Sequence, residues 1–382
     1  SRIPQVRGES STARNSRISF SENQRLEIFF MKFGVTVSRF DEIDLAVQAE
    51  GQGYDFCWVW DSPLLRSNLW VMMALVAERT ERIRVGSGVA IPGLRVAPAT
   101  ANAIATVNRL APGRTFLGVG TGNTAMRNMG QLPMTVADYA EDLRVIKALL
   151  NGETVDYTTN GRTHPVNFQS LELDYVDIEH PIPIHVGGFG PRSQALAGEL
   201  GDGLITGIPR GGSIPDALSN VQRGADRVGR DLDGFETTAL VNMLILNRDE
   251  TLSSPRVLQE VGSSVMVNVH YLYDRFIEAD AAPPAFVHSI WDEYVDFRQQ
   301  RDADRSVSDV HSSHYGHLDE QEARFVTPEL IRSCAIVGQP GDIVEQLIEL
   351  EKQGLDGLNF IPPVDQQYEI CARFASEVIA RM

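Results

Sequence analysis

Short apolar runs alternate with longer amphipathic stretches from Met31 onward, which is the pattern of strands and helices around a parallel sheet. Eight apolar runs are predicted as strands: Lys32–Val37, Asp55–Trp60, Ile83–Val89, Thr115–Gly120, Ile182–Gly187, Gly203–Thr206, Thr237–Leu246 and Gly357–Ile361. The stretches predicted as helices are Asp41–Gln52, Leu69–Arg79, Pro98–Leu110, Val136–Leu150, Arg192–Leu200 and Asp342–Gln353. Eight strands with intervening helices favour an α/β fold of the closed (β/α)8 TIM barrel type, with insertions, over an open doubly wound sheet.

Two segments interrupt this alternation. Thr154–Leu173 is predicted to be a β-hairpin, because Asn160 and Gly161 form a favoured two-residue turn. The longer segment, Asp249–Val326, carries Trp291, several tyrosines and five of the eight histidines. Long insertions on a barrel often select the substrate, so we expect a lid or a substrate wall here.

The first thirty residues differ from the rest of the chain. Residues 1–30 are rich in serine, arginine and asparagine, show no sustained periodicity and lack the apolar core of a signal peptide. We expect a flexible N-terminal arm; a translation start at Met31 and a partner-binding arm are the alternatives. Residues 31–382 are expected to form a single domain.

The charge and the cysteines limit the partners and the compartment. A formal net charge of −17 argues against nucleic acid or an anionic membrane surface as the main partner. No apolar stretch approaches the roughly 18 residues of a membrane span. Cys57 and Cys334 lie in apolar runs, and the three cysteines lack metal-site spacing, so buried thiols in a reducing cytoplasm are expected.

The carboxyl ends of the predicted strands carry glycines and hydroxyls rather than catalytic pairs. This end of a TIM barrel is where chemistry occurs. The residues expected there are Trp60, Asp61, Ser62, Ser87, Gly88, Val89, Gly120, Thr121, Gly122, Asn123, Gly187, Gly188, Phe189, Gly190 and Gly207. Only Asp61 among them is ionisable, which argues against a hydrolase with a nucleophile and base, paired carboxylates or metal ligands. Such walls suit a large, flat cofactor that brings its own reactivity.

Two glycine-rich turns are candidate ligand seats. Gly118, Gly120 and Gly122 allow the backbone to approach a ligand closely. The turn at residues 187–190 leads to Pro191 and a helix, whose first N–H groups can bind phosphate. Each turn is also compatible with a tight strand-to-helix connection that binds nothing.

Five segments, in this order along the chain, resemble the bacterial luciferase-like superfamily of flavin- and deazaflavin-dependent oxidoreductases. They are Ile83–Val89, Phe116–Gly122, Val186–Gly190, Gly201–Gly203 and Val337–Asp342. The resemblance implies a (β/α)8 barrel that binds FMN or the deazaflavin coenzyme F420 at the strand carboxyl ends. It also implies a small organic substrate and a homodimer.

The resemblance further implies roles for single residues. Gly88 and Val89, preceded by Ser87, would form a cis-peptide bulge behind the central ring of the cofactor. The residues that would line this ring and its polar edge are Asp61, Gly120, Thr121 and Gly122. The residues that would hold the phosphate of the cofactor are Gly187, Gly188, Phe189 and Gly190.

Two positions depart from the deazaflavin-dependent glucose-6-phosphate dehydrogenases, whose Gly-Val-Gly-Thr-Gly motif matches residues 118–122. Their histidine base corresponds to Ser62, and their glutamate corresponds to Asn123, so sugar oxidation is not expected. The candidates for catalysis are Asp61, Asn123, His270 and His288. Of these, the two histidines are candidates for the missing proton relay.

The function predicted from these residues is hydride transfer at a flavin-type cofactor, with coenzyme F420 slightly favoured over FMN. The alternatives are an FMN-dependent monooxygenase that receives reduced flavin from a separate reductase, and a flavin-binding barrel without turnover. No metal site is predicted, because Asp309 and Gly316 favour a loop around His311, His314 and His317. His185, in an apolar run, is expected to be a core residue.

Overall fold

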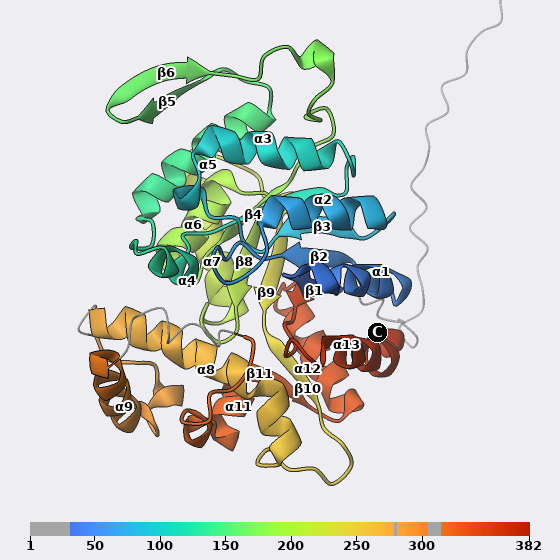
Figure 1. Cartoon of the computed structure of the whole chain (residues 1–382), viewed down its shortest axis with the longest axis vertical. Helices are drawn as coiled ribbons and strands as arrows, with labels where there is room; N and C mark the ends of the chain where they lie inside the picture. The colour runs from blue at the N-terminus through green and yellow to red at the C-terminus, as the bar shows by residue number, and fades with distance from the viewer. Residues whose placement is uncertain (1–30, 279–280, 305–314) are drawn as a thin grey trace, which may run out of the picture.

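Eight parallel strands close into a barrel in the computed structural model, which describes residues 31–278, 281–304 and 315–382 (Figure 1). The strand order around the barrel is β1-β12-β9-β8-β7-β4-β3-β2. The strands are β1 (Lys32–Val37), β2 (Phe56–Val59), β3 (Arg84–Ser87), β4 (Thr115–Val119), β7 (Ile184–Gly187), β8 (Gly203–Gly207), β9 (Glu236–Leu240) and β12 (Gly357–Asn359). The predicted TIM barrel is confirmed, whereas the predicted arm at residues 1–30 lies outside the described residues.

Helices cover the outside of the barrel. They are α1 (Ile43–Gly51), α2 (Leu69–Arg79), α3 (Ala97–Asn108), α5 (Val136–Leu150), α6 (Pro191–Leu200), α7 (Ile214–Val228), α12 (Pro340–Lys352) and α13 (Gln367–Glu377). Side-chain caps fix where several of them begin. Thr135 accepts the Asp138 N–H at the start of α5, and Ser213 accepts the Asp216 N–H at the start of α7.

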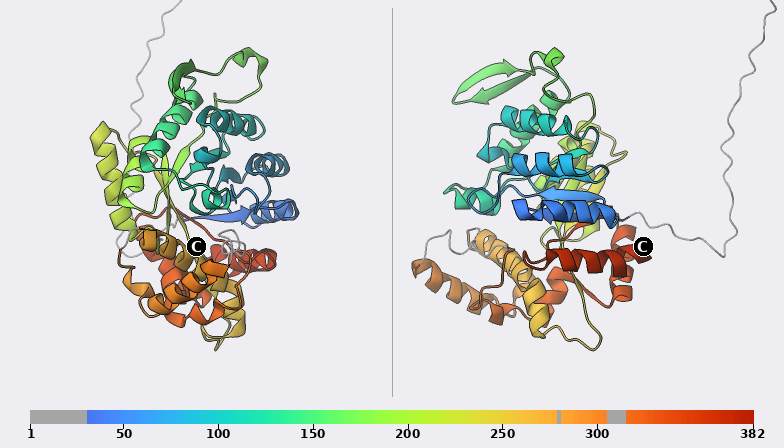
Figure 2. Two further views of the ribbon diagram at one scale, coloured as in Figure 1. Left: turned by 60° about the vertical axis from the view of Figure 1, so that its left-hand side comes forward. Right: turned by 45° about the vertical axis from the view of Figure 1, so that its right-hand side comes forward.

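The predicted hairpin is confirmed as β5 (Val155–Thr159) and β6 (Arg162–Val166), joined at Asn160 and Gly161, whose φ angles are both positive. It projects from the opposite end of the molecule to the block formed by the long insertion (Figures 1 and 2). That block contains α8 (Pro255–Glu278), α9 (Trp291–Asp304) and α11 (Pro328–Cys334). It has an apolar core of its own, centred on residues such as Val265, Tyr294 and Phe325.

A short strand pair outside the barrel joins the two ends of this block. β10 (Asn242–Ile245) follows β9 almost directly and pairs in parallel with β11 (Ala335–Gly338). The apolar run Thr237–Leu246, predicted as one strand, therefore forms two strands in different sheets. The break falls at Val241, whose N–H bonds to the Asn359 carbonyl at 3.2 Å as the chain leaves the barrel.

Side chains of the barrel strands alternate between the barrel interior and the layer beneath the helices. Phe56 and Trp58 of β2 lie inside the barrel against the ring of Phe116, with ring centroids 5.6 and 4.9 Å from it. Cys57 and Val59, the intervening residues, join the larger core between strands and helices. All three cysteines of the chain are buried and free of disulfides.

An ion-pair cluster closes the barrel at the amino ends of its strands. The Glu236 carboxylate lies 2.5 Å from Lys32 Nζ, 2.9 Å from Arg84 Nη1 and 3.4 Å from His185 Nε2. Burial lowers the pKa of His185 to about 4, so its ring is neutral at neutral pH. His185 is thus a core residue, as predicted. We call these four residues the closed-end cluster.

Candidate active site

A cavity of about 480 Å³ lies at the other end of the barrel, at the carboxyl ends of the strands. Trp58, Gly88 and Val89 line the floor of the cavity, on the side of the barrel interior. The turns after β4, β7 and β8 form its walls. Helix α8 of the insertion contributes further lining residues, including His270 and Tyr271. Within the described part of the chain, every helix is too short or too polar to cross a membrane.

A bulge after β3 shapes the floor of the cavity. The Gly88–Val89 peptide is cis, as the resemblance implies. The Val89 side chain packs against Gly120, where a Cβ would lie 2.6 Å from a Val89 methyl group. Position 120 is therefore glycine because the bulge comes so close. Ser87 does not line the cavity, since it is buried beneath the bulge and donates its hydroxyl hydrogen to the Gly118 carbonyl at 2.7 Å.

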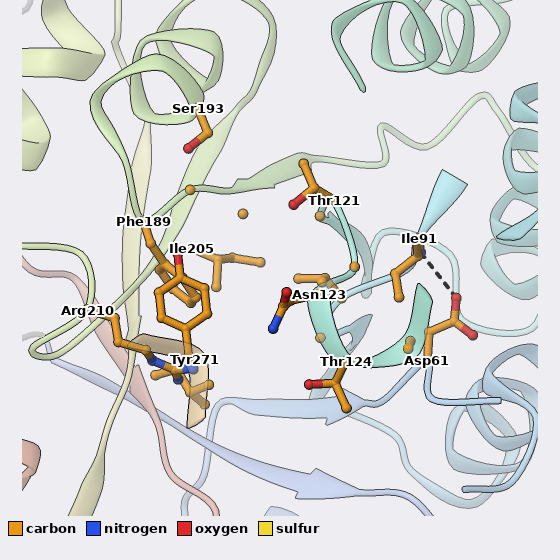
Figure 3. A pocket seen from close by; sticks show the side chains of 18 of the residues that line it. Asp61, Ile91, Thr121, Asn123, Thr124, Phe189, Ser193, Ile205, Arg210 and Tyr271 are labelled. Carbon is orange, nitrogen blue, oxygen red and sulfur yellow. Dashed lines mark hydrogen bonds between the residues drawn. The ribbon is translucent and has the colours of Figure 1, made fainter. Parts of the chain in front are cut away.

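The turn after β4 forms one wall. Gly122 has a φ of 75°, in the left-handed region that glycine adopts readily, and it caps the short helix α4 (Asn123–Asn128). Thr121 and Asn123 on this turn line the cavity (Figure 3). Asn123 Oδ1 accepts from Arg127 Nε at 3.0 Å, and its Nδ2 lies 3.5 Å from the Asp274 carboxylate of α8. Asn123 thus links the barrel wall to the insertion.

The turn after β7 forms the opposite wall, lined by Gly187, Gly188, Phe189 and Gly190. The Gly188 N–H is already bonded to the Ile205 carbonyl at 2.9 Å, so it does not face a ligand. Donors are instead expected from the Arg192 and Ser193 N–H groups in the first turn of α6, because Pro191 has no N–H and the Gln194 N–H bonds to the Gly190 carbonyl at 3.0 Å. A Cβ placed on Gly190 would have one neighbouring atom within 4 Å, Arg275 Nη2 at 3.8 Å, and both residues line the cavity.

Asp61 lines the cavity, but both of its oxygens are occupied. Its carboxylate accepts from Arg95 at 2.5 and 3.0 Å and from the Ile91 N–H at 3.1 Å (Figure 3). The side chain is 1% exposed. A bidentate, charge-assisted pair of this kind holds the chain after the bulge in place. This geometry favours positioning over acid–base work for Asp61.

The two histidines predicted for a proton relay lie in different places. His270 lines the cavity, and its Nε2 is 2.9 and 3.0 Å from the two carboxylate oxygens of Glu322, which is also buried. His288 lies exposed on the surface, where its Nε2 is 3.0 Å from the Pro283 carbonyl, and it does not line the cavity. The expectation that His288 lies at the site is therefore corrected, because His288 is exposed whereas the adjacent Val287 packs into the core of the insertion.

Several lining residues were not among the predicted site residues. They include Trp58, Ile91, Thr124, Arg210, Tyr271, Arg275 and Tyr315, whereas Arg192 and Ser193, expected near the phosphate seat, also line the cavity. A signal existed for Arg210, which follows the end of β8 within Gly-Ile-Pro-Arg-Gly-Gly, a turn that presents one basic side chain. No group of histidine, cysteine and acidic side chains in the described ranges is placed to hold a metal ion. His311 and His314 lie outside those ranges.

The chain matches the family model described as luciferase-like monooxygenase over residues 34–357. It is 28% identical over 334 residues to the 5,10-methylenetetrahydromethanopterin reductase of Archaeoglobus fulgidus, covering 85% of this chain and 91% of that protein. It is 31% identical over 211 residues to the F420-dependent glucose-6-phosphate dehydrogenase of Segniliparus rotundus, covering 51% of this chain and 61% of that protein.

A solved structure shares the fold. The coenzyme F420 dependent tetrahydromethanopterin reductase from Methanopyrus kandleri superposes with a TM-score of 0.66 and 20% sequence identity. The superposition covers 92% of this chain and 99% of that chain. Since the identity is low, this likeness speaks for the fold alone.

Proposed function

The chain belongs to the luciferase-like monooxygenase family, and from this we propose that it is an oxidoreductase that binds coenzyme F420 in the cavity and exchanges hydride with a small organic substrate. FMN is the alternative cofactor. Coenzyme F420 is favoured because a relative in sequence carries it in its name. The cofactor supplies the reacting ring when it is bound, and the protein seats and orients it.

The cavity carries this proposal, because its residues fit a flat ring with a phosphate-bearing tail. The Gly88–Val89 bulge offers an apolar floor, and the first turn of α6 offers N–H donors at one end. The open side of Gly190, with Arg275 beside it, leaves room for an anionic group. We assign the phosphate to this end and the ring to the bulge.

His270 is the residue we propose for moving the proton that accompanies hydride transfer. Its ring reaches the cavity from α8, and the Glu322 carboxylate fixes its orientation through Nε2. Ser62 and Asn123 also line the cavity, but neither titrates near neutral pH. Residues 249–326, which include α8, are proposed to act as the substrate wall.

The second candidate function is an FMN-dependent monooxygenase that receives reduced flavin from a separate reductase. The name of the matching family favours it, as does the lining by Ser62 and Asn123 in place of an acid–base pair. The cavity walls around Val89, Ile91 and Ile205 are apolar, which would keep water from a reactive intermediate.

A paired binding titration tests these proposals. The purified protein is titrated with coenzyme F420 and with FMN, and binding is followed by cofactor fluorescence. We expect a dissociation constant for F420 at least about ten-fold lower than for FMN. The reverse order, with oxygen consumption in the presence of reduced FMN, would support the monooxygenase. Affinities no better than about millimolar for both would refute the proposed function.

The assembly and the location are also proposed. Exposed apolar residues gather on neighbouring elements of one side of the barrel, namely Phe40, Leu64, Val71 and Val96, and Leu64 is 83% exposed. We propose that this side forms a homodimer, since the four side chains lie on or next to consecutive helices that pack against one another. The three buried thiols are consistent with the proposed cytoplasmic location.

A further inference from the structure

Arg210 is presented to the cavity by a tightly held turn after β8. The Gly211 N–H bonds to the Gly207 carbonyl at 2.6 Å, and Gln194 Nε2 donates to the Gly211 carbonyl at 3.0 Å. A Cβ on Gly211 would lie 1.9 Å from Thr206 Oγ1, so the turn is closely packed. The backbone that carries Arg210 is therefore fixed before any ligand arrives.

Aromatic side chains surround the guanidinium. It lies 4.8 Å from the centre of the Phe189 ring and 5.7 Å from that of Tyr271, and its Nη2 donates to the Tyr315 hydroxyl at 3.1 Å. The Tyr315 ring is in turn 5.4 Å from Trp60. We call Trp60, Phe189, Tyr271 and Tyr315 the aromatic box. Figure 3 shows Arg210, Phe189 and Tyr271 together on one side of the cavity, across from Asn123.

No carboxylate in the described ranges forms an ion pair with Arg210, and its buried Nε has no hydrogen-bond partner there. Asp61 is the one acidic residue among the described lining residues, and Arg95 already neutralises it. The chain has 51 acidic and 34 basic residues, so the excess of basic over acidic side chains in the cavity is opposite to the charge of the whole chain. A half-buried guanidinium without a carboxylate partner in these ranges offers a charged donor for an anion that enters the cavity.

We propose that Arg210 binds the anionic group of the substrate, a carboxylate or a phosphate monoester, while a planar apolar body of the substrate lies in the cavity beside the aromatic box. This inference rests on the proposed function and adds the substrate class to it. Arg275 is assigned to the cofactor instead, because its guanidinium lies beside Gly190 and donates to the Tyr271 hydroxyl at 3.2 Å. Tyr271 thus separates the two arginines, with its hydroxyl toward Arg275 and its ring face toward Arg210.

The test uses three probes that share a phenyl ring on the cofactor-loaded protein: benzoate, phenyl phosphate and the neutral benzyl alcohol. Binding is measured by calorimetry. We expect at least one of the anions to bind about ten-fold or more tightly than benzyl alcohol. The Arg210→Gln variant should lose this preference while its affinity for benzyl alcohol and for the cofactor changes less than about three-fold. Arg210→Lys should retain part of the preference, since the charge remains but the planar fork is lost.

Arg324→Gln is the matched control. Arg324 also lies over aromatic rings, 5.3 Å from Phe297 and 4.7 Å from Phe325, but it is outside the cavity. Its substitution should leave all three probe affinities unchanged. If Arg210→Gln fails to fold, the salt dependence of the wild-type protein replaces it: added chloride should weaken binding of the favoured anion but not of benzyl alcohol.

Two results would overturn the proposal: equal affinity of the wild-type protein for all three probes, or a loss of cofactor affinity of about ten-fold or more in Arg210→Gln. The second result would assign Arg210 to the cofactor. The same titration on the cofactor-free protein separates this inference from the proposed function. A preserved preference for an anion there, without any cofactor binding, would sustain the anion site and refute the proposed cofactor.

Discussion

The two ends of the barrel treat charge in opposite ways. At the amino ends of the strands, Lys32 and Arg84 share the Glu236 carboxylate. At the carboxyl ends, Arg210 and Arg275 face a cavity, and no carboxylate in the described ranges pairs with either. The charged side chains that pair within the protein stabilise the barrel, whereas the arginines at the cavity are available to bind an anionic ligand.

Aromatic rings follow the same division. Phe56 and Phe116 fill the barrel interior and contact each other and Trp58 edge to face. Trp58 also reaches the cavity, so it forms the boundary between the filled and the hollow parts of the barrel. The comparison implies that substitutions in the closed-end cluster lower stability without weakening ligand binding. Substitutions at the cavity should weaken ligand binding without lowering stability.

The largest effect is expected from Glu236→Ala. The substitution removes the carboxylate that Lys32 and Arg84 share in a partly buried position. We therefore expect the free energy of unfolding to fall by about 3 kcal/mol. Cofactor affinity should change less than about three-fold. Chemical denaturation and the fluorescence titration measure the two effects. The control, Glu199→Ala, removes an ion pair whose Arg227 partner is largely exposed, and should cost less than about 1 kcal/mol.

The opposite pattern is expected from Gly190→Leu. The backbone there is extended, with a φ of −122°, so a side chain is tolerated but would project into the proposed phosphate end. We expect the dissociation constant of the cofactor to rise about 100-fold, equivalent to roughly 2.7 kcal/mol, with the free energy of unfolding nearly unchanged. Gly341→Leu, at an open position in α12, is the control and should alter neither. An unchanged cofactor affinity in Gly190→Leu would refute the proposed seat.

A smaller effect is expected from His185 as the pH falls. Its folded-state pKa of about 4 is below the unfolded value of about 6.5, so the unfolded chain binds more protons between these values. Stability contributed by the neutral ring is therefore complete above about pH 6.5 and is lost as the pH falls toward 4. Between pH 7 and pH 5 the loss should be about 2 kcal/mol. Denaturation at both pH values measures it, and His185→Gln should flatten this slope; an equal slope in the variant would contradict the assignment.

The barrel was predictable because each strand is a short apolar run bounded by turn residues. The alternation of these runs with amphipathic stretches therefore predicts the repeated strand and helix units of the barrel. Helix α7 was missed even though Ser213 and Asp216 provide a cap, a local signal that apolar runs alone do not reveal. Strand β10 was missed because nothing in the run Thr237–Leu246 marks the point where the chain changes sheets. Such a change depends on pairing with β11, which is distant in the sequence.

The glycine walls of the site were predictable for the same reason, since they continue the strands. Arg210 and Tyr315 were not, because they meet across 105 positions of the chain and no local pattern marks their contact. His270 lies at the cavity and His288 on the surface, although both belong to one aromatic-rich segment of the sequence. Only packing distinguishes the two.

The β10–β11 pair has a consequence for how this barrel can change. Residues 246–334 leave and re-enter the barrel through two strands that lie side by side, so the ends of the insertion are held together whatever lies between them. The entropy of closing a long loop rises only slowly with its length. We therefore expect that this segment can be replaced or lengthened at little cost to the stability of the barrel, so that the proposed substrate wall can change while the proposed cofactor seat stays the same.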